Sequence, residues 1–209
     1  MWVPGTDWLL SVSLFAIAMA ASPGPNKAIV VASGGQFGLR KSMPLILGIS
    51  GGFSAMIVAL AAGGAGLLRS ETVMLILKWL GVAYVLWIAW RIAATPAQAD
   101  VSTNMSDRAR VPMSFWSAAL LQWVNPKSWL TAASSLTLYA RTSHSQQMVL
   151  MSLAIAILFF VIATASSIIW CQIGRFIYRD GAFAKQRQLN LAISGLLLLS
   201  LVPILIAEP

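Results

Sequence analysis

Charge is what this sequence has least of. Only 10% of its 209 residues are charged, whereas 58% are hydrophobic, and the mean hydropathy is +0.79. A soluble domain carries roughly 25% charged residues, so the composition argues strongly against a soluble globular enzyme. The net charge of +8 is spread in small groups between apolar runs rather than pooled in one patch, which argues against a nucleic-acid-binding protein.

Reactive and ligating side chains are also scarce. The one cysteine, Cys171, cannot form an internal disulfide or a cysteine-rich metal site. A nucleotide-binding glycine-rich loop is absent, so ATP hydrolysis within the chain is not expected. The apolar runs contain no Asp, Glu or His, which weighs against an enzyme within the membrane. We therefore expect no catalytic residues, no metal and no cofactor.

What the sequence does contain is apolar runs that are long enough to span a bilayer, which takes about 20 mostly apolar residues. Short loops join these runs, and almost nothing is left over for a soluble domain. The whole chain, 1–209, is therefore predicted to be one all-α integral membrane domain with six transmembrane helices. The runs cover residues 8–39, 43–68, 73–90, 111–140, 148–174 and 188–207.

Basic residues are unevenly divided between the two ends of these runs. Nine lie on one side and two on the other, and the positive-inside rule places the larger group in the cytoplasm. Both termini are then predicted on the outer face. The nine are Arg40, Lys41, Arg91, Arg108, Arg110, Arg175, Arg179, Lys185 and Arg187, and the two are Arg69 and Arg141.

A short cluster occurs in both halves of the chain. The first run carries Pro-Gly-Pro-Asn-Lys at 23–27, and the fourth carries Asn-Pro-Lys at 125–127, 100 residues later. Because each half has three runs, an odd number, the second half enters the membrane in the opposite sense. This is the inverted-topology repeat typical of secondary transporters. We assign the first repeat to 1–95, a cytoplasmic loop to 96–111 and the second repeat to 112–209.

The two proline clusters predict that the first and fourth helices are broken. Proline removes a helical hydrogen bond and clashes with the preceding turn. Backbone groups freed at membrane depth are tolerated only within protein or beside a water-filled cavity. Proline also favours the first turn of a new helix, so a half-helix should begin near Asn26. The free N–H groups at its start form an anion site.

Lys27 lies in that first turn without an acid in the spans to pair with it. Burying a lysine at membrane depth costs roughly 2.5–3.5 kcal/mol, and a substrate carboxylate would supply the missing counter-charge. The alternatives are that this lysine reaches water or is neutral. Lys78, near the outer end of its run, is expected to reach water. The substrate-binding residues that we predict are Pro23, Gly24, Pro25, Asn26, Lys27, Gln122, Asn125, Pro126 and Lys127.

Closely spaced glycines mark the second run. Gly48 and Gly52 form a small-xxx-small pair, and Gly51 lies between them. Close helix packing is the favoured interpretation, and a role in gating is the alternative.

These motifs resemble the LysE-type amino-acid exporters, a superfamily that includes the homoserine/threonine exporters. The resemblance rests on Ser-Pro-Gly-Pro-Asn at 22–26, Gly-Ile-Ser-Gly-Gly at 48–52 and Asn-Pro-Lys at 125–127. It implies a transporter in the bacterial cytoplasmic (inner) membrane that exports a small amino-acid-like substrate. It also leaves open a proton or another coupling ion and a homo-oligomer.

One departure from the family bears on the substrate. Family members often carry an aspartate just after the glycines of the second run, where this chain has Gly52 and Phe53. Without that acid, proton coupling would need another titrating group, for which a desolvated lysine is a candidate. A cavity with two lysines and no acid favours a neutral amino acid or a small derivative. The alternatives are a channel or facilitator on the same scaffold, and a membrane scaffold without transport.

Overall fold

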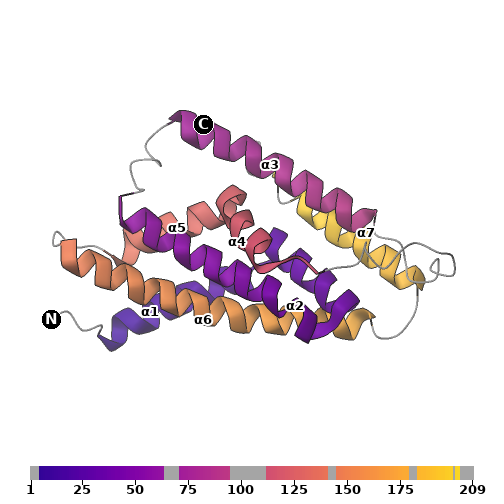
Figure 1. Cartoon of the computed structure of the whole chain (residues 1–209), viewed down its shortest axis with the longest axis horizontal. Helices are drawn as coiled ribbons and strands as arrows, with labels where there is room; N and C mark the ends of the chain where they lie inside the picture. Colours follow the sequence, from indigo (N-terminus) through magenta and orange to yellow (C-terminus); the bar gives the residue numbers. More distant parts are fainter. Residues whose placement is uncertain are drawn as a thin grey trace.

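The structure, a computed structural model, describes residues 5–63, 71–94, 112–140, 145–178, 183–199 and 201–202. All regular structure in these residues is helical, which agrees with the predicted all-α class (Figure 1). The helices are α1 (Thr6–Ala21), α2 (Pro25–Ala61), α3 (Glu71–Ala93), α4 (Phe115–Val124), α5 (Pro126–Tyr139), α6 (Ser145–Tyr178) and α7 (Phe183–Leu199).

Two helical segments of the described chain are long and apolar enough to cross a membrane, Pro25–Ala61 and Gln146–Ile177. The other apolar helices of the described chain are shorter, and two of them, Thr6–Ala21 and Phe115–Val124, belong to predicted runs that are divided. The first run contains α1 and the beginning of α2, and the fourth contains α4 and α5. The basic loop predicted at 96–111 lies outside the described residues.

Both predicted helix breaks are present. After α1, Ser22 and Gly24 have extended backbone conformations, and Pro25 then occupies the first position of α2. Between α4 and α5 only Asn125 is non-helical (φ −86°, ψ 110°), and Pro126 begins the next helix. The proline in each case lies where its missing N–H costs nothing, in the first turn.

A sharp turn at Gly38 divides α2 into two helices. Gly38 has φ 73° and ψ 174°, a left-handed conformation that favours glycine. The hydroxyl groups of Ser33 and Ser42 lie only 2.7 Å apart, whereas nine residues of straight helix would span about 13 Å. The two parts therefore fold back on each other, and Arg40 and Lys41 are exposed at the turn.

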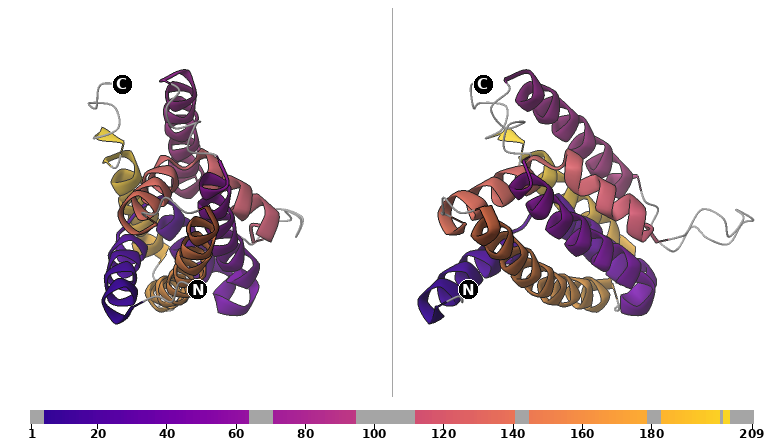
Figure 2. Two further views of the ribbon diagram at one scale, coloured as in Figure 1. Left: turned by 90° about the vertical axis from the view of Figure 1, so that its left-hand side faces the viewer. Right: turned by 60° about the vertical axis from the view of Figure 1, so that its left-hand side comes forward.

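Close backbone contacts hold α2 against its neighbours. Helix α2 packs mainly on α6 and α4, whereas α3 packs on α7 (Figure 1; Figure 2). A Cβ atom on Gly34 would overlap the carbonyl group of Cys171, and one on Gly48 would overlap the carbonyl oxygen of Phe115. One on Gly52 would lie 2.6 Å from Cα of Ala119. These glycines allow the helices to approach more closely than any other residue would.

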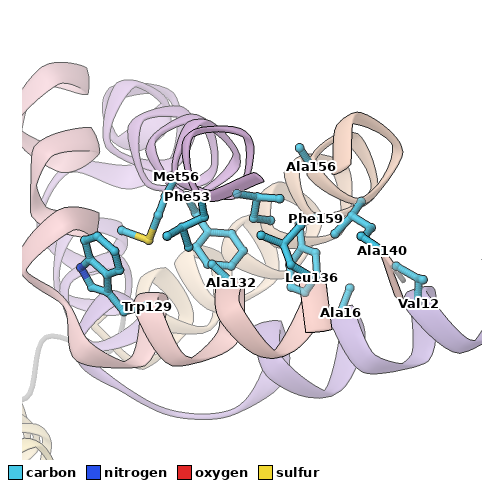
Figure 3. Packing of buried hydrophobic residues seen from close by; sticks show 13 residues of the cluster. Val12, Ala16, Phe53, Met56, Trp129, Ala132, Leu136, Ala140, Ala156 and Phe159 are labelled. Atoms are coloured by element: carbon cyan, nitrogen blue, oxygen red, sulfur yellow. The ribbon is translucent and has the colours of Figure 1, made fainter. Parts of the chain in front are cut away.

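The largest buried cluster joins α1, α2, α5 and α6 (Figure 3). Phe53 of α2 and Phe159 of α6 meet edge to face with their ring centres 5.1 Å apart. Trp129 and Ala132 contribute the face of α5, and Val12 lies on α1. This cluster adjoins the two helix breaks and supplies the apolar wall of the site described next.

Candidate functional site

A cavity lies where the two helix breaks meet. Water-sized molecules can occupy about 70 Å³ of it, and one water needs roughly 10–15 Å³ on this measure, so it has room for several waters or a small solute. Five helices contribute to its wall. The lining residues are Met19, Ala20, Ser22, Gly24, Pro25, Asn26, Lys27, Ile49, Phe53, Gln122, Asn125, Lys127, Ser128, Thr131, Phe159, Ala163 and Ser167.

Lys27 is a buried cation in the wall of this cavity. Its side chain is 8% exposed, and its Nζ donates to Oγ of Ser167 on α6 over 3.0 Å. A lysine ammonium has three donors, and a single neutral hydroxyl does not compensate a buried charge. The arrangement therefore suits an anionic ligand beside Lys27.

Lys127 reaches from the first turn of α5 back to the end of α1. Its Nζ donates to Oγ of Ser22 over 2.6 Å, to the carbonyl oxygen of Ser22 over 3.2 Å and to that of Pro23 over 3.4 Å. A Cβ atom on Gly24 would lie 3.5 Å from this side chain. The two lysines thus have different surroundings: one has a single neutral partner, and the other has three oxygen acceptors.

An amide pair joins the two breaks. Nδ2 of Asn26 donates to Oε1 of Gln122 over 2.8 Å, and the reverse contact, from Nε2 to Oδ1, measures 3.4 Å. Gln122 is fully buried; it also donates to the carbonyl oxygen of Ala118 and accepts from Ser128. This network positions the start of α2 relative to the end of α4.

The two half-helices that begin at the breaks differ in capping. The side chain of Asn125 accepts from the N–H of Lys127 over 3.1 Å and so caps α5. Helix α2 has no side-chain cap at Gly24. The N–H groups of Lys27 and Ala28 donate to the carbonyl oxygen of Gly24, whereas that of Asn26 has no acceptor within the helix. The start of α2 is therefore the half-helix end with a donor left for a ligand.

Seven of the nine predicted substrate-binding residues line the cavity, and the two prolines that remain do not. Pro23 presents its carbonyl oxygen to Lys127, and the ring of Pro126 packs against Gly81 of α3. Of the predicted packing or gating glycines, none lines the cavity. Gly48 and Gly52 face the backbone of α4, and a Cβ atom on Gly51 would lie 3.5 Å from the ring of Phe115.

Sequence reasoning missed several lining residues. Ser22 directly precedes the proline motif, and this position could have identified it as a lining residue. Ser128 adjoins the second motif in the same way. Ser167, with Ser166, interrupts the uncharged fifth run, and a polar pair in such a run is a weaker signal. Phe53, which follows the glycines where the resemblance implied an acid, lines the cavity. None of the described lining residues is acidic.

The comparisons with known proteins bear on this arrangement. The LysE type translocator family model matches residues 17–202. This chain belongs to the LysE type translocator family. The resemblance read from the motifs is thereby confirmed, and all the cavity residues of this translocator lie within the matched region.

Individual relatives of this LysE-type translocator are named cysteine/O-acetylserine efflux proteins. The protein from Salmonella choleraesuis (strain SC-B67) is 32% identical over 196 residues, 92% of this chain and 95% of the relative. The one from Klebsiella pneumoniae is 30% identical over 204 residues, 96% and 99% of the two chains. The one from Escherichia coli O1:K1 is 29% identical over 187 residues, 88% and 90%. No solved structure matched the translocator.

Proposed function

We propose that this translocator is a secondary-active exporter of small neutral amino acids or their derivatives across the cytoplasmic membrane. The observation that carries the proposal is the cavity at the two helix breaks, which contains two lysines and no described acid. Relatives at 29–32% identity are named for efflux of cysteine and O-acetylserine, and both compounds are amino acids with an α-carboxylate and an uncharged side chain.

The substrate carboxylate binds at the start of α2 in this proposal. The N-terminus of a helix carries a partial positive charge, and its free N–H groups point at an anion. Among the described residues, the N–H group of Asn26 has no backbone acceptor, and Lys27, which adds a full charge in the same turn, has Ser167 as its single hydrogen-bond partner. A carboxylate there would provide the counter-charge that the buried lysine lacks.

Charge also determines which substrates are disfavoured. Two cationic side chains without an acid repel lysine, arginine and metal ions, because like charges in a low-dielectric cavity interact strongly. Phe53, where many family members have an aspartate, leaves this repulsion uncompensated. A zwitterionic substrate with a neutral side chain brings no net charge and is the best match.

Alternating access would follow from an inverted pair of three-helix repeats in six spans. Support comes from packing between parts of the two halves: α2 on α6, α3 on α7, and α1 on α5. One break falls in each half, and the two breaks meet at the cavity. Rocking of one repeat against the other would expose the site to each side in turn. In this arrangement both termini lie on the outer face.

Efflux from vesicles that contain the purified protein tests the proposal. Vesicles are loaded with labelled, reduced cysteine, with O-acetylserine or with lysine, and a proton gradient or a membrane potential is imposed. We expect cysteine and O-acetylserine to leave these vesicles faster than they leave protein-free vesicles, and this efflux should depend on the imposed gradient. Lysine should be retained. Lys27→Met should slow efflux, whereas Arg175→Met, which removes an exposed charge outside the cavity, should not.

The alternative functions predict other results in the same vesicles. Efflux that follows only the substrate ratio and ignores the imposed gradient would indicate a facilitator or channel. Rapid loss of lysine together with the neutral compounds would contradict the charge argument. No efflux of any compound would leave a non-transporting scaffold as the better interpretation.

A further inference from the structure

The ammonium group of Lys127 fills a small binding site of its own. Three oxygens surround it: Oγ of Ser22 at 2.6 Å, the carbonyl oxygen of Ser22 at 3.2 Å and that of Pro23 at 3.4 Å. An ammonium group has three N–H donors, so donors and acceptors match in number. The site is built by Ser22 and Pro23, which directly follow α1, not by the helix to which the lysine belongs.

The end of α1 is well suited to a cation for two reasons. The last carbonyl groups of a helix carry a partial negative charge and have no N–H donor within the helix. In addition, the hydroxyl of Ser22 donates to the carbonyl oxygen of Met19 over 2.8 Å. Its proton is therefore used, and Oγ is left to accept from the ammonium.

We propose that this three-oxygen site is the subsite for the α-ammonium group of the substrate, and that Lys127 occupies it only until the substrate displaces it. The proposal rests on the proposed function. The α-ammonium group of an amino acid has the same charge and the same three donors as the lysine. Both compete for Ser22 and Pro23, and one excludes the other.

The position of this subsite relative to the carboxylate site supports the assignment. Only Gly24 and Pro25 separate Pro23 from Asn26, so the end of α1 and the start of α2 face the same cavity. The broken helix thus presents its negative end to one pole of a zwitterion and its positive end to the other. The substrate class is then a free α-amino acid, and compounds that lack the ammonium group lose half of the recognition.

Equilibrium binding to the purified full-length protein in lipid nanodiscs tests the displacement. The probes are reduced L-cysteine and 3-mercaptopropionate, which has the carboxylate and thiol but no ammonium group. Lys127→Met removes the tethered competitor, so cysteine should bind about tenfold more tightly than to the wild-type protein. Weaker or unchanged binding of cysteine would overturn the proposal, because Lys127 would then contact the carboxylate or nothing.

Ser22→Ala provides a second test that does not change the charge of the cavity. In the Lys127→Met background it should weaken cysteine binding about tenfold, as expected for loss of a hydrogen bond to a charged group, and leave 3-mercaptopropionate unaffected. In the wild-type background Ser22→Ala should weaken cysteine binding less, because cysteine and Lys127 both lose the same acceptor oxygen. Equal effects on the two probes would overturn the assignment.

Ser166→Ala is the matched control. Its hydroxyl also bonds to the end of α1, at the carbonyl oxygen of Ala20 over 2.9 Å, but it does not line the cavity. It should affect neither probe. If the wild-type protein binds and moves no amino acid at all, the proposed function fails and this inference fails with it. If the wild-type protein exports cysteine but Lys127→Met weakens its binding, only the subsite assignment fails.

Discussion

Asn26 and Gln122 are 96 positions apart in the chain, and their side-chain amides are joined by a hydrogen bond of 2.8 Å. Each residue lies next to one of the two helix breaks, so this pair connects the first half of the protein to the second at the cavity. Any movement of one half against the other must either carry the pair as a unit or separate it.

Replacing Gln122 by leucine should destabilise the protein through this pair. The substitution keeps the side chain at a similar size but leaves the Asn26 amide and the Ser128 hydroxyl without their acceptor. Each buried polar group left unsatisfied costs about 1–3 kcal/mol. Thermal unfolding of the purified protein in detergent measures the effect. Ser128→Ala, which removes only one donor, should lower the melting temperature less than Gln122→Leu does. Equal melting temperatures of the two variants would contradict the network.

The glycines of the second run offer a matched comparison. Alanine at Gly48 would place a Cβ atom against the carbonyl oxygen of Phe115, and overpacking of this kind costs about 1–3 kcal/mol. Alanine at Gly51 would meet only the rings of Phe115, at an ordinary 3.5 Å, and Phe160, at 3.9 Å. We expect Gly48→Ala to lower the melting temperature and Gly51→Ala to leave it unchanged or raise it slightly. The reverse order would contradict the close packing of α2 on α4.

The helix breaks could be predicted from the sequence because they depend on local chemistry. The motifs around Pro25 and Pro126 predict a helix start at each proline, and the structure has one at both positions, whereas Pro44 lies inside α2. The partners of the lysines could not be predicted, because they depend on packing between distant segments. Lys127 reaches Ser22 across 105 positions and Lys27 reaches Ser167 across 140, and no local pattern records these distances.

The turn at Gly38 could also be predicted only in part from the sequence. The basic residues at 40 and 41 marked the end of a run, so a boundary between two spans was expected there. Which residue makes the turn was not predicted, because many glycines in this sequence lie in regular helix, as Gly48 does. Only the left-handed conformation of Gly38 identifies it.

The predicted orientation can be measured with thiol reagents that do not cross membranes. Cys171 is fully buried, so the wild-type protein should react neither in intact cells nor in inverted vesicles, which makes it a silent background. A cysteine at Ser143 should then be labelled in intact cells, and one at Ser102 only in inverted vesicles. Labelling in the opposite pattern would reverse the assignment of inner and outer faces.

The charge of the cavity should decide the substrate class. Phe53 lines the cavity, and Phe53→Asp would place a carboxylate beside two lysines. We expect lysine and arginine to compete more strongly with cysteine in this variant, and Phe53→Leu to show no such gain. Competition measured during efflux from vesicles gives the comparison. If cationic amino acids already compete strongly in the wild-type protein, the charge argument is wrong.

The central claim is that a substrate carboxylate is the counter-charge of Lys27, and binding of reduced cysteine to Lys27→Met tests it most directly. Methionine keeps the length of the side chain, and removing a buried cation should not prevent folding. Loss of a charge-assisted hydrogen bond of about 1.5–3 kcal/mol should raise the dissociation constant roughly 10- to 100-fold relative to the wild-type protein. A dissociation constant equal to that of the wild-type protein, measured on folded protein in the same nanodiscs, would contradict the account.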